Sequence, residues 1–521
     1  MTAAPPDPAA RIRARWQAAR GPLFTDLYEL AMAQVYWREG IAEQNSQFDH
    51  FFRRYPNYGT HQAGFCVSAG LGPFRRWLGS LRFGTDEVAA LGALRDSAGN
   101  AMFAADFLAW LADPDRFAAL ELTAVPEGRV VHPHAPIVSV TGPLAAAQLV
   151  ETALLNHLNY ATLIATKAAR IVQSARGGTV LEFGMRRGPG AGVSDGVRAA
   201  LIAGCAGTSD VEASVALGSS PKGTHAHALV QAYLANGAGE LEAFRAVARA
   251  APDDCVLLLD TVDTLHSGVP HAITVFEELR AAGHRPAGVR LDSGDLAYLA
   301  VQVAAQLDGA GFGDVPIVLS GDLDELNIWQ ILTQVDEEAA RVGLDAGSVR
   351  RRLAYGAGTR LITSHGDPAL GGVYKLVGVE RDGGWAPAIK ISEDPGKVPL
   401  PGRKAVTRLY DGRGMAIVDL VGLADEDPLG QATIVTHHPT RPDVSSVHSP
   451  DEVAAAEPLH EPVDLTAPDE PLDVLRGRCR ADVERLDVGV RRIVNPHMYH
   501  VSVTDRLHHL RADLVARTNP T

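Results

Sequence analysis

The sequence predicts an α/β protein in which helices cover a parallel sheet. Between residues 255 and 359, short apolar runs that end in polar or glycine residues recur about every 30 residues, and helical stretches separate them. This alternation is typical of successive βα units, and continuous apolar strands indicate a sheet that is buried on both faces. A barrel and an open doubly wound sheet both fit, because both carry their sites at the carboxyl ends of the strands.

The bulk composition excludes several classes of protein. The 521 residues suggest two or three domains, and the formal charge of −14 argues against a nucleic-acid binder, which needs a basic face. Four cysteines without a CxxC pair indicate a reducing compartment with neither a disulfide framework nor a structural zinc site. The N-terminus has no apolar signal region, and no run approaches the ~18 apolar residues of a membrane span. We therefore expect a cytoplasmic protein with no membrane or nucleic-acid partner.

The elements follow one another in a regular order. Residues 1–20 form a leader, and residues 144–174 carry a long helical pattern that ends before Gly177 and Gly178. The expected strands lie within 179–184, 255–261, 287–295, 316–322 and 352–359, and the expected helices within 269–283, 295–309 and 322–343. The predicted domains are an N-terminal α/β domain (21–150, completed by about 360–435), a catalytic α/β-barrel domain (151–360) and an irregular, then helical, C-terminal region (436–521).

Polar residues follow the predicted strands at the edge where a site would form. Arg290 and Asp292 in "RLDSGD" share one face of a strand. Arginine suits an anionic or planar aromatic partner, and aspartate suits sugar hydroxyls or Mg²⁺. Ser293 or Asp295 could instead simply cap the following helix.

Two further strand ends carry glycines and a carboxylate. "SGDLDE" provides Gly321, which lets backbone approach a ligand, and the carboxylate of Asp322. "YGAGT" provides a turn of small residues, Gly356, Gly358 and Thr359, whose N–H groups could hold a phosphate.

Lysine is rare in this chain and unevenly placed. Four of the six lysines, Lys375, Lys390, Lys397 and Lys404, lie within one short stretch, whereas arginine supplies the other basic charge. A solvated loop is one explanation. The clustering favours a site for a polyanion.

"GTHAHA" places His225 and His227 two positions apart. In a strand they would share a face, so an HxH metal site of the hydrolase type is one alternative, and two strand-end histidines with satisfied hydrogen bonds are another. The later strand ends offer Asp260, Arg290 and Asp322, and an arginine fits a metal cage poorly.

Taken together, these motifs resemble those of the nicotinate phosphoribosyltransferase family. The matching blocks, in the family's order, are "LFTDLYELAMAQVYW", "FDHFFRRYP", "LEFGMRRG", "GTHAHA", "LLLDTVDT", "GVRLDSGDLAYLA", "LSGDLDE", "YGAGTRLIT", "PALGGVYKLV", "IKISEDPGK" and the tail "RRIVNPHMYHVSVTDRLHHLR". The resemblance covers roughly residues 21 to 516.

The resemblance implies a fold and a reaction. The fold would be an irregular TIM-like α/β barrel with a second α/β domain built from N-terminal and post-barrel segments, plus a helical C-terminal tail. The reaction would join nicotinate to 5-phosphoribosyl 1-pyrophosphate, releasing pyrophosphate and nicotinate mononucleotide in NAD salvage. The family couples this reaction to ATP hydrolysis, uses Mg²⁺, and forms homodimers whose active sites are shared between two chains.

The resemblance also implies roles for individual residues. His227 would be phosphorylated by ATP and would act in catalysis with Arg290 and Asp292. The expected nicotinate-binding residues are Tyr28 (from the partner chain), Phe183, Arg186, Ser209 and Arg290, with Arg186 also matching a phosphate contact. The expected phosphoribosyl pyrophosphate-binding residues are Arg53, Asp292, Gly321, Asp322, Gly356, Gly358, Thr359, Lys375 and Lys397. Asp292 and Asp322 would also hold Mg²⁺.

One position bears on the choice between acid and amide. The relatives that use nicotinamide carry an aspartate after "GT", where this chain has Ser209, although Asp210 is the next residue. The sequence departs from the family at Val262, Tyr355 and Ala228, and residues 189–198 match poorly. The alternatives are therefore a nicotinamide phosphoribosyltransferase and a family member that binds ligand without catalysis.

Overall fold

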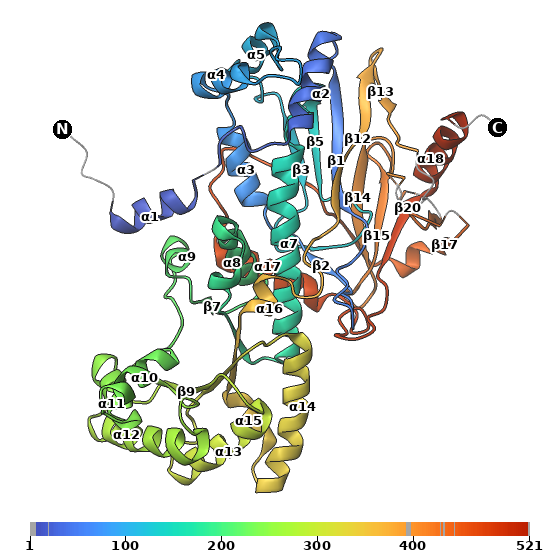
Figure 1. The fold of residues 1–521 in the computed structure, drawn as a ribbon. Coiled ribbons are helices and arrows are strands. Elements are labelled where there is room, and N and C mark those ends of the chain that lie inside the picture. Colours follow the sequence, from blue (N-terminus) through green and yellow to red (C-terminus); the bar gives the residue numbers. More distant parts are fainter. Residues whose placement is uncertain are drawn as a thin grey trace. The chain divides into compact units, whose positions relative to one another are not determined.

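The computed structural model describes residues 7–18, 20–391, 398–427, 429–430, 433–441 and 443–518. The chain forms two compact units (Figure 1). Unit 1 comprises Met1–Trp16 and Lys167–His365, and unit 2 comprises Gln17–Thr166 and Gly366–Thr521. Helix α7 (Glu151–Ser174) contributes its first part to unit 2 and its last part to unit 1. No helix in the described ranges combines the length and the apolar character that crossing a bilayer demands.

Unit 1 is built on a six-stranded parallel sheet. Its strands, in spatial order, are β7 (Gly207–Thr208), β6 (Thr179–Glu182), β11 (Leu353–Ala357), β10 (Ile317–Ser320), β9 (Gly288–Leu291) and β8 (Val256–Leu258). All five pairings are parallel. The five predicted strand positions are thus confirmed, because an apolar run that ends in a polar residue marks a buried parallel strand reliably.

The sheet does not close into the predicted TIM-like barrel. In the described part of the chain β7 and β8 are its two edges and are not paired with each other, so the sheet is an open half-barrel. Between them the chain forms helices α9 (Val211–Ala216), α10 (His227–Ala235) and α11 (Glu240–Ala250) and no strand. A barrel needs more strands than this segment supplies.

Helices flank the strands of unit 1 where the sequence predicts them. The remaining helices are α1 (Pro8–Trp16), α8 (Val193–Ile202), α12 (Val269–Ala281), α13 (Leu296–Gly309), α14 (Glu325–Val342), α15 (Ala346–Arg352) and α16 (Thr359–Ile362), with a π-helix at Thr264–Gly268 and short 3₁₀ turns at Met185–Arg187 and Gly190–Gly192. Asp295 caps α13 by accepting from the N–H of Tyr298, whereas Ser293 does not cap. The capping alternative therefore holds for Asp295.

Unit 2 contains two six-stranded sheets and a two-stranded one. The first sheet is antiparallel, in the order β13 (Gly384–Pro387), β12 (Gly372–Arg381), β1 (Asn45–Phe52), β5 (Val138–Pro143), β3 (Glu121–Ala124) and β19 (Glu461–Pro462). The second is mixed, in the order β17 (Ser445–His448), β16 (Ile434–His437), β20 (His500–Thr504), β15 (Ala416–Leu423), β14 (Lys404–Tyr410) and β18 (Ala455–Pro458). Strands β2 (Cys66–Val67) and β4 (Val130–Val131) form the third.

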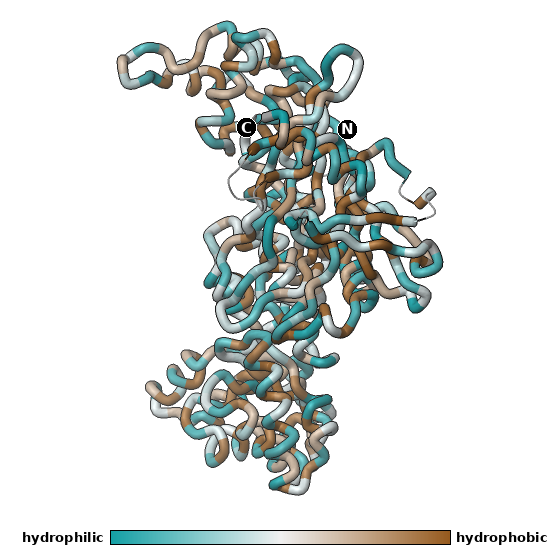
Figure 2. The backbone as a smooth tube through the Cα atoms, turned by 90° about the vertical axis from the view of Figure 1, so that its right-hand side faces the viewer, coloured by the Kyte–Doolittle hydropathy of each residue, from teal (hydrophilic) through white to brown (hydrophobic). Residues whose placement is uncertain are grey.

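Helices complete unit 2, and its C-terminal part differs from the prediction. The helices are α2 (Leu27–Arg38), α3 (Leu71–Ser80), α4 (Thr85–Ala93), α5 (Ala105–Leu111), α6 (Leu144–Leu149), α17 (Leu472–Glu484) and α18 (Asp505–Thr518), with a 3₁₀ turn at Pro450–Glu452. A simple helical tail is not confirmed, because strands β16 to β20 lie in this region and β20 pairs in parallel with β15. In both units hydrophobic and hydrophilic stretches alternate along the chain, as one-sided burial requires (Figure 2).

Buried ions hold the mixed sheet of unit 2 together. Arg408 on β14 donates to both carboxylate oxygens of Asp419 on β15 at 2.7 and 2.8 Å, and both side chains are almost fully buried. Arg408 also donates to Asp482 of α17, which accepts a further bond from Arg129. Because removing one member would leave a buried charge unpaired, this network fixes how strands and helix pack.

One member of the lysine cluster is structural. Lys404 is buried, forms an ion pair with Asp49 at 2.8 Å and donates to the carbonyls of Leu400 and Gly402. Burial lowers the pKa of Lys404, and the Asp49 carboxylate opposes that effect. Lys404 is therefore not available to a polyanion, and fewer lysines can contact one than their clustering in the sequence indicates.

Candidate functional site

The carboxyl ends of the parallel strands in unit 1 enclose a cavity of about 290 Å³. Its lining residues are Phe183, Arg186, Arg187, Ser209, Gly223, Thr224, Arg290, Asp292, Ser320, Gly321, Asp322, Gly356, Gly358 and Thr359. Ten of the residues predicted to form the site are among these. The ends of parallel strands meet at one edge of a sheet, which explains why residues so far apart in the sequence converge here.

Arg290 and Asp292 form a rigid pair on one wall. Nη2 of Arg290 lies 2.7 Å from Oδ1 of Asp292, and Nε of Arg290 lies 2.8 Å from the hydroxyl of Ser320, which also donates to Asp292. Burial opposes ionisation of Asp292, but the Ser320 hydrogen bond and the Arg290 charge outweigh it, so its pKa lies below the ordinary value. The second carboxylate oxygen of Asp292 stays available for a ligand.

A buried carboxylate, Asp260, links His227 to this pair. Oδ1 of Asp260 lies 3.2 Å from Nε2 of His227, whose side chain is 36% exposed. Oδ2 of Asp260 accepts from the backbone N–H of Asp292 and from the hydroxyl of Ser293. Asp260 thus contacts two residues of the predicted site, although the predicted set omits it; its position at the end of a predicted strand was the signal in the sequence.

His225 has a different environment from His227. Its Nε2 accepts the backbone N–H of Leu258 at 3.1 Å, and its Nδ1 faces the carbonyl of Ala226 at 3.4 Å. Burial lowers the pKa of His225, which favours the neutral ring that these bonds require. Both histidines precede or begin α10 rather than sit in a strand, and no described group of three or more histidine, cysteine or acidic side chains could hold a metal. His225 is therefore a satisfied structural histidine.

Phe183 is positioned by strand β11. Its N–H donates to the carbonyl of Ala357, and its ring lies so close to Gly356 that a Cβ there would stand 2.4 Å from a ring carbon. The guanidinium carbon of Arg290 lies 6.0 Å from the centre of the ring. Only glycine at position 356 leaves this aromatic face in place.

Glu182 holds the turns next to Phe183 and Ser209 in place. Its buried carboxylate accepts the N–H of Gly184 and, at 2.6 Å, the hydroxyl of Thr208, and burial raises its pKa. The N–H of Ser209 donates to the backbone carbonyl of Glu182. Glu182 thereby fixes the turn after β6 and the turn after β7 relative to each other.

The turn after β10 approaches the neighbouring strand very closely. Gly321 has a φ of +100°, and a Cβ there would stand 2.3 Å from the carbonyl oxygen of Asp292. Asp322 has a φ of +49°, and its exposed carboxylate makes no hydrogen bond or ion pair with any described residue. A left-handed aspartate is uncommon, and such residues gather at functional sites.

The carboxylates suit a hard cation held together with a phosphorylated substrate. Mg²⁺ is usually bound by one or two carboxylates while substrate phosphates and water complete its shell. Asp322 and the free oxygen of Asp292 provide that donor set at one edge of the cavity. The residues present therefore fit Mg²⁺.

Ser209 and its neighbour Asp210 have separate roles. Ser209 lines the cavity, whereas Asp210 is buried and caps α9 by accepting from the N–H of Ala213 at 3.0 Å. The N–H of Asp210 in turn donates to Thr208. Ser209 and not Asp210 is therefore the lining residue of the cavity.

Two exposed arginines supply positive charge to the cavity. Arg186 and Arg187 follow Phe183 in a short 3₁₀ turn, and the guanidinium of neither makes a hydrogen bond or ion pair with a described residue. Only Arg186 belongs to the predicted set. Because both residues of the pair line the cavity, "RRG" provides two guanidinium groups for anionic ligands.

The remaining predicted ligands belong to unit 2 or to positions that are not described. Tyr28 on α2 is 49% exposed, Arg53 follows β1, and Lys375 on β12 donates to the carbonyl of Tyr374 and lies 3.7 Å from Glu151. Lys397 lies outside the described residues. The substrate contacts of these four residues stay predictions.

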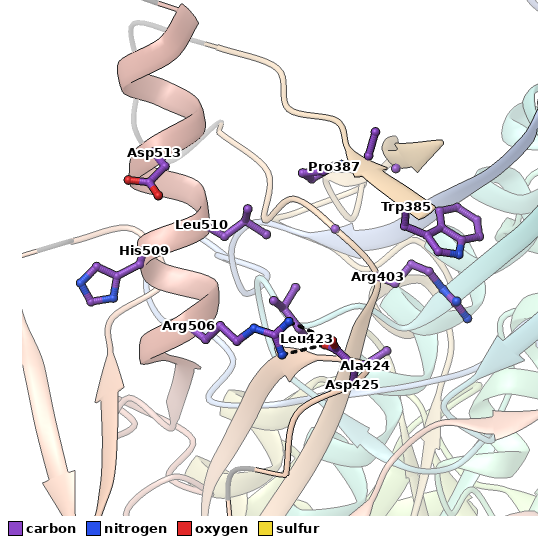
Figure 3. A pocket seen from close by; sticks show the side chains of 13 residues that line it. Trp385, Pro387, Arg403, Leu423, Ala424, Asp425, Arg506, His509, Leu510 and Asp513 are labelled. Carbon is purple, nitrogen blue, oxygen red and sulfur yellow. Dashed lines mark hydrogen bonds and ion pairs between the residues drawn. The ribbon is translucent and has the colours of Figure 1, made fainter. Parts of the chain in front are cut away.

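A larger cavity, of about 650 Å³, lies in unit 2, but its charged groups are less available to a ligand (Figure 3). Arg506 of α18 forms two hydrogen bonds with Asp425, and Leu510 and Leu423 provide apolar surface. Arg403 packs on the ring of Trp385, with its guanidinium carbon 4.8 Å from the ring centre. Because its central arginine is already paired, we place the candidate site in unit 1.

The matching family models and the curated relatives name one family. Residues 23–159 match the nicotinate phosphoribosyltransferase (NAPRTase) N-terminal domain, and residues 403–511 match the nicotinate phosphoribosyltransferase C-terminal domain. A nicotinate phosphoribosyltransferase of Bacillus subtilis (strain 168) is 42% identical over 81% of this chain and 80% of its own length. The Homo sapiens nicotinate phosphoribosyltransferase is 33% identical over 99% of this chain and 100% of its own. The crystal structure of human nicotinic acid phosphoribosyltransferase superimposes with a TM-score of 0.75 at 29% identity, covering 94% of this chain and 99% of that one.

Proposed function

Because the chain belongs to the nicotinate phosphoribosyltransferase family, we propose that it joins nicotinate to 5-phosphoribosyl 1-pyrophosphate, forming nicotinate mononucleotide and pyrophosphate. We further propose that ATP hydrolysis drives this reaction through a phosphohistidine at His227, which would make the enzyme ligase-like. The enzyme would serve NAD salvage in the cytoplasm as a homodimer.

The observation that supports the reaction best is the convergence of two kinds of group in one cavity. The carboxylates of Asp292 and Asp322 and the guanidinium groups of Arg186 and Arg187 line the same space. Carboxylates suit ribose hydroxyls and a bound cation, and unpaired arginines suit phosphates or a carboxylate. A phosphorylated sugar and an aromatic acid need both.

The chemical step breaks the bond between C1 of the ribose and the pyrophosphate oxygen while the pyridine nitrogen bonds to C1. Positive charge develops on the ribose in the transition state, and negative charge develops on the leaving group. Asp292 stabilises the former, and its ion pair with Arg290 keeps it ionised and oriented. Bound Mg²⁺, held by Asp292 and Asp322, would neutralise charge on the pyrophosphate.

His227 is suited to accept a phosphoryl group. Its Nε2 faces the Asp260 carboxylate, so the proton resides on Nε2 and the Nδ1 lone pair is free to attack. The new bond joins Nδ1 to the γ-phosphorus, the bond from that phosphorus to its bridging oxygen breaks, and ADP leaves. Asp260 then stabilises the positive ring. The Asp260 carboxylate also accepts the N–H of Asp292. It thereby couples phosphorylation of His227 to the position of Asp292, which binds the ribose.

The position of Ser209 favours the acid over the amide. A carboxylate at this point would repel nicotinate, whereas a hydroxyl can donate to it. Asp210, the residue that could reverse the argument, is committed to capping α9.

A direct assay tests the proposal. The purified protein is incubated with Mg²⁺, phosphoribosyl pyrophosphate and either nicotinate or nicotinamide, with and without ATP, and mononucleotide and ADP are quantified. We expect product from nicotinate, more of it with ATP, and loss of the ATP effect in His227→Ala. Product from nicotinamide alone would overturn the choice of the acid, and bound ligand without product would indicate a catalytically silent protein.

A further inference from the structure

The loop between α9 and α10 lies at the open edge of the sheet in unit 1. Residues 219–226 form neither helix nor strand. The N–H of Lys222 donates to the carbonyl of Thr208 on β7 at 2.8 Å, and Nε2 of His225 accepts the N–H of Leu258 on β8 at 3.1 Å. The loop is therefore attached to β7 and to β8, the two edge strands, which are not paired with each other.

This loop is weakly held and leads directly into the proposed phosphoryl acceptor. Residues 219–223 are exposed, and His227 is the first residue of α10. Segments with few buried contacts open at a low cost in free energy, while the strands beside them stay folded. The loop can therefore move while the sheet keeps its shape.

Arg290 attaches the loop to the candidate site. Its Nη2 donates to Asp292 at 2.7 Å, and its Nε donates to the hydroxyl of Ser320 at 2.8 Å. Its Nη1 donates to the hydroxyl of Thr224 at 3.3 Å. The Thr224 hydroxyl gives its own proton to the carbonyl of His225, which leaves its oxygen as the acceptor for Arg290. The bond to Thr224 is the longest of the three bonds of Arg290, and we infer that it is the weakest.

The shape of the guanidinium group makes Thr224 a competitor of a bound carboxylate. A carboxylate binds an arginine best through two parallel N–H groups on one edge of the fork. The edge formed by Nε and Nη2 is taken by Ser320 and Asp292, so the edge formed by Nη1 and Nη2 is left for a ligand. Nη1 is the atom that donates to Thr224. A carboxylate on this edge of Arg290 therefore draws Nη1 away from Thr224.

We propose that the Thr224 hydroxyl competes with the carboxylate of nicotinate for Nη1 of Arg290, and that phosphorylation of His227 ends this competition by moving the loop. Thr224 is then a positioning residue that sets the affinity for the acid and couples that affinity to ATP. The proposal rests on the proposed function, in which nicotinate binds Arg290 and His227 accepts a phosphoryl group.

The place of His227 explains how phosphorylation moves the loop. The phosphoryl group adds about two negative charges and three acceptor oxygens, and it does so directly after the last residue of the loop. The weakest attachment of the loop, the bond from Arg290 to Thr224, should break first. Linkage is reciprocal, so nicotinate that breaks this bond should favour phosphorylation of His227 by the same factor.

Steady-state kinetics of Thr224→Val tests the competition. Valine keeps the shape of threonine and removes the oxygen that accepts from Arg290. Without ATP, the KM for nicotinate should fall about fivefold or more, which is the lower end of typical coupling between sites, and kcat should change little. With ATP, the parent and the variant should have the same KM, because the bond is absent in both. A KM without ATP that equals or exceeds that of the parent would overturn the proposal.

Three controls separate competition from a general structural effect. Thr224→Ser keeps the hydroxyl and should behave as the parent does. Ser220→Ala removes a hydroxyl of the same loop that makes no hydrogen bond with a described residue, and it should leave the KM unchanged. Nicotinamide has one acceptor oxygen and cannot take both N–H groups, so its affinity, measured by competition, should be the same in the parent and in Thr224→Val. An equal gain for acid and amide would show that Thr224 does not compete with a carboxylate.

Hydrogen exchange tests the proposal in the parent, without a substitution that could impair folding. Saturating nicotinate should speed amide exchange in peptides that cover residues 219–226, because the loop loses its bond to Arg290. Slower or unchanged exchange in this segment would contradict the release of the loop.

The kinetic assay also distinguishes failure of this proposal from failure of the proposed function. A parent that makes no mononucleotide from nicotinate refutes both. A parent that makes it, with a KM that Thr224→Val does not lower, refutes the competition alone and leaves the proposed reaction unaffected. An effect of ATP on the KM that persists in Thr224→Val would overturn the link to His227.

Discussion

At the scale of single residues, the two carboxylates of the candidate site, Asp260 and Asp292, each use their two oxygens differently. Asp260 uses one oxygen for His227 and the other for the turn that carries Asp292. Asp292 uses one oxygen for Arg290 and keeps the second for ligand. In each carboxylate, one oxygen fixes the position of the side chain, and the other oxygen is left for the reaction. Such fixed positions preorganise a site.

The first residue prediction concerns Asp260. Asp260→Asn keeps the size of the side chain but removes the charge that orients and stabilises the His227 ring. We expect phosphohistidine formation from ATP to fall about 100-fold, while binding of phosphoribosyl pyrophosphate changes little. Acid-labile phosphate on the protein, measured by rapid quench, checks this. The control Asp263→Asn alters an exposed carboxylate that caps the π-helix and should retain the full signal. Normal phosphorylation in Asp260→Asn would remove Asp260 from the mechanism.

The second residue prediction concerns Ser209. Ser209→Asp places a negative charge in the cavity, so the KM for nicotinate should rise about tenfold or more through like-charge repulsion. Nicotinamide, which is neutral, should be affected less. Steady-state kinetics with both substrates measures the difference. Ser209→Ala is the matched control, because it removes the hydroxyl without adding charge, and an equal rise in KM in both variants would show that charge is not the cause.

At the scale of elements, the positions of the strands could be predicted from the spacing of apolar residues. The pairing of the strands could not, because it depends on contacts between distant segments. The strands around Arg290, Asp322 and Gly356 were predictable because each is an apolar run that ends in a polar or glycine residue. The open edge beside β7 was not, since β7 has only two residues and nothing local shows which strands pair. For the same reason Asp210 could be recognised as a helix cap, and not as a ligand, only from the structure.

The element-scale prediction concerns β11. In Gly356→Ala the new Cβ would clash with the Phe183 ring, so the ring or the strand must move. We expect about 1–3 kcal/mol of lost stability, as for overpacked sites, and a higher KM for nicotinate. Denaturant unfolding and steady-state kinetics measure the two effects. Gly309→Ala, at a glycine at the end of α13 with open space around it, is the control and should be neutral or stabilising. An unchanged KM in Gly356→Ala would separate Phe183 from nicotinate binding.

At the scale of the whole molecule, burial of acids makes stability depend on pH. Glu29 of α2 is fully buried, and Gln148 donates to its Oε2 at 2.6 Å. Burial raises its pKa to about 7, with the charge of Glu151 acting in the same direction. The folded protein therefore binds the Glu29 proton more tightly than the unfolded chain does.

The sign of this effect gives the fourth prediction. The contribution of Glu29 is fully present below its unfolded pKa, near 4.5, and is lost as the pH rises through about 7. The free energy of unfolding of Glu29→Gln should accordingly fall less than that of wild type between pH 4.5 and 7.5. Urea unfolding at a series of pH values measures this, with Glu39→Gln, at the exposed end of α2, as the control. Parallel curves for wild type and Glu29→Gln would refute the assignment.

The order of the segments in unit 2 also matters for biosynthesis. Strand β1 pairs with β5 on one side, which follows soon along the chain, and with β12 on the other, which the ribosome makes only after all of unit 1 has been translated. During that interval one edge of β1, including the apolar residues Phe48, Phe51 and Phe52, lacks its partner, and unpaired edges promote aggregation. The nascent chain should depend on chaperones at this stage, and unit 1 has the opportunity to fold first.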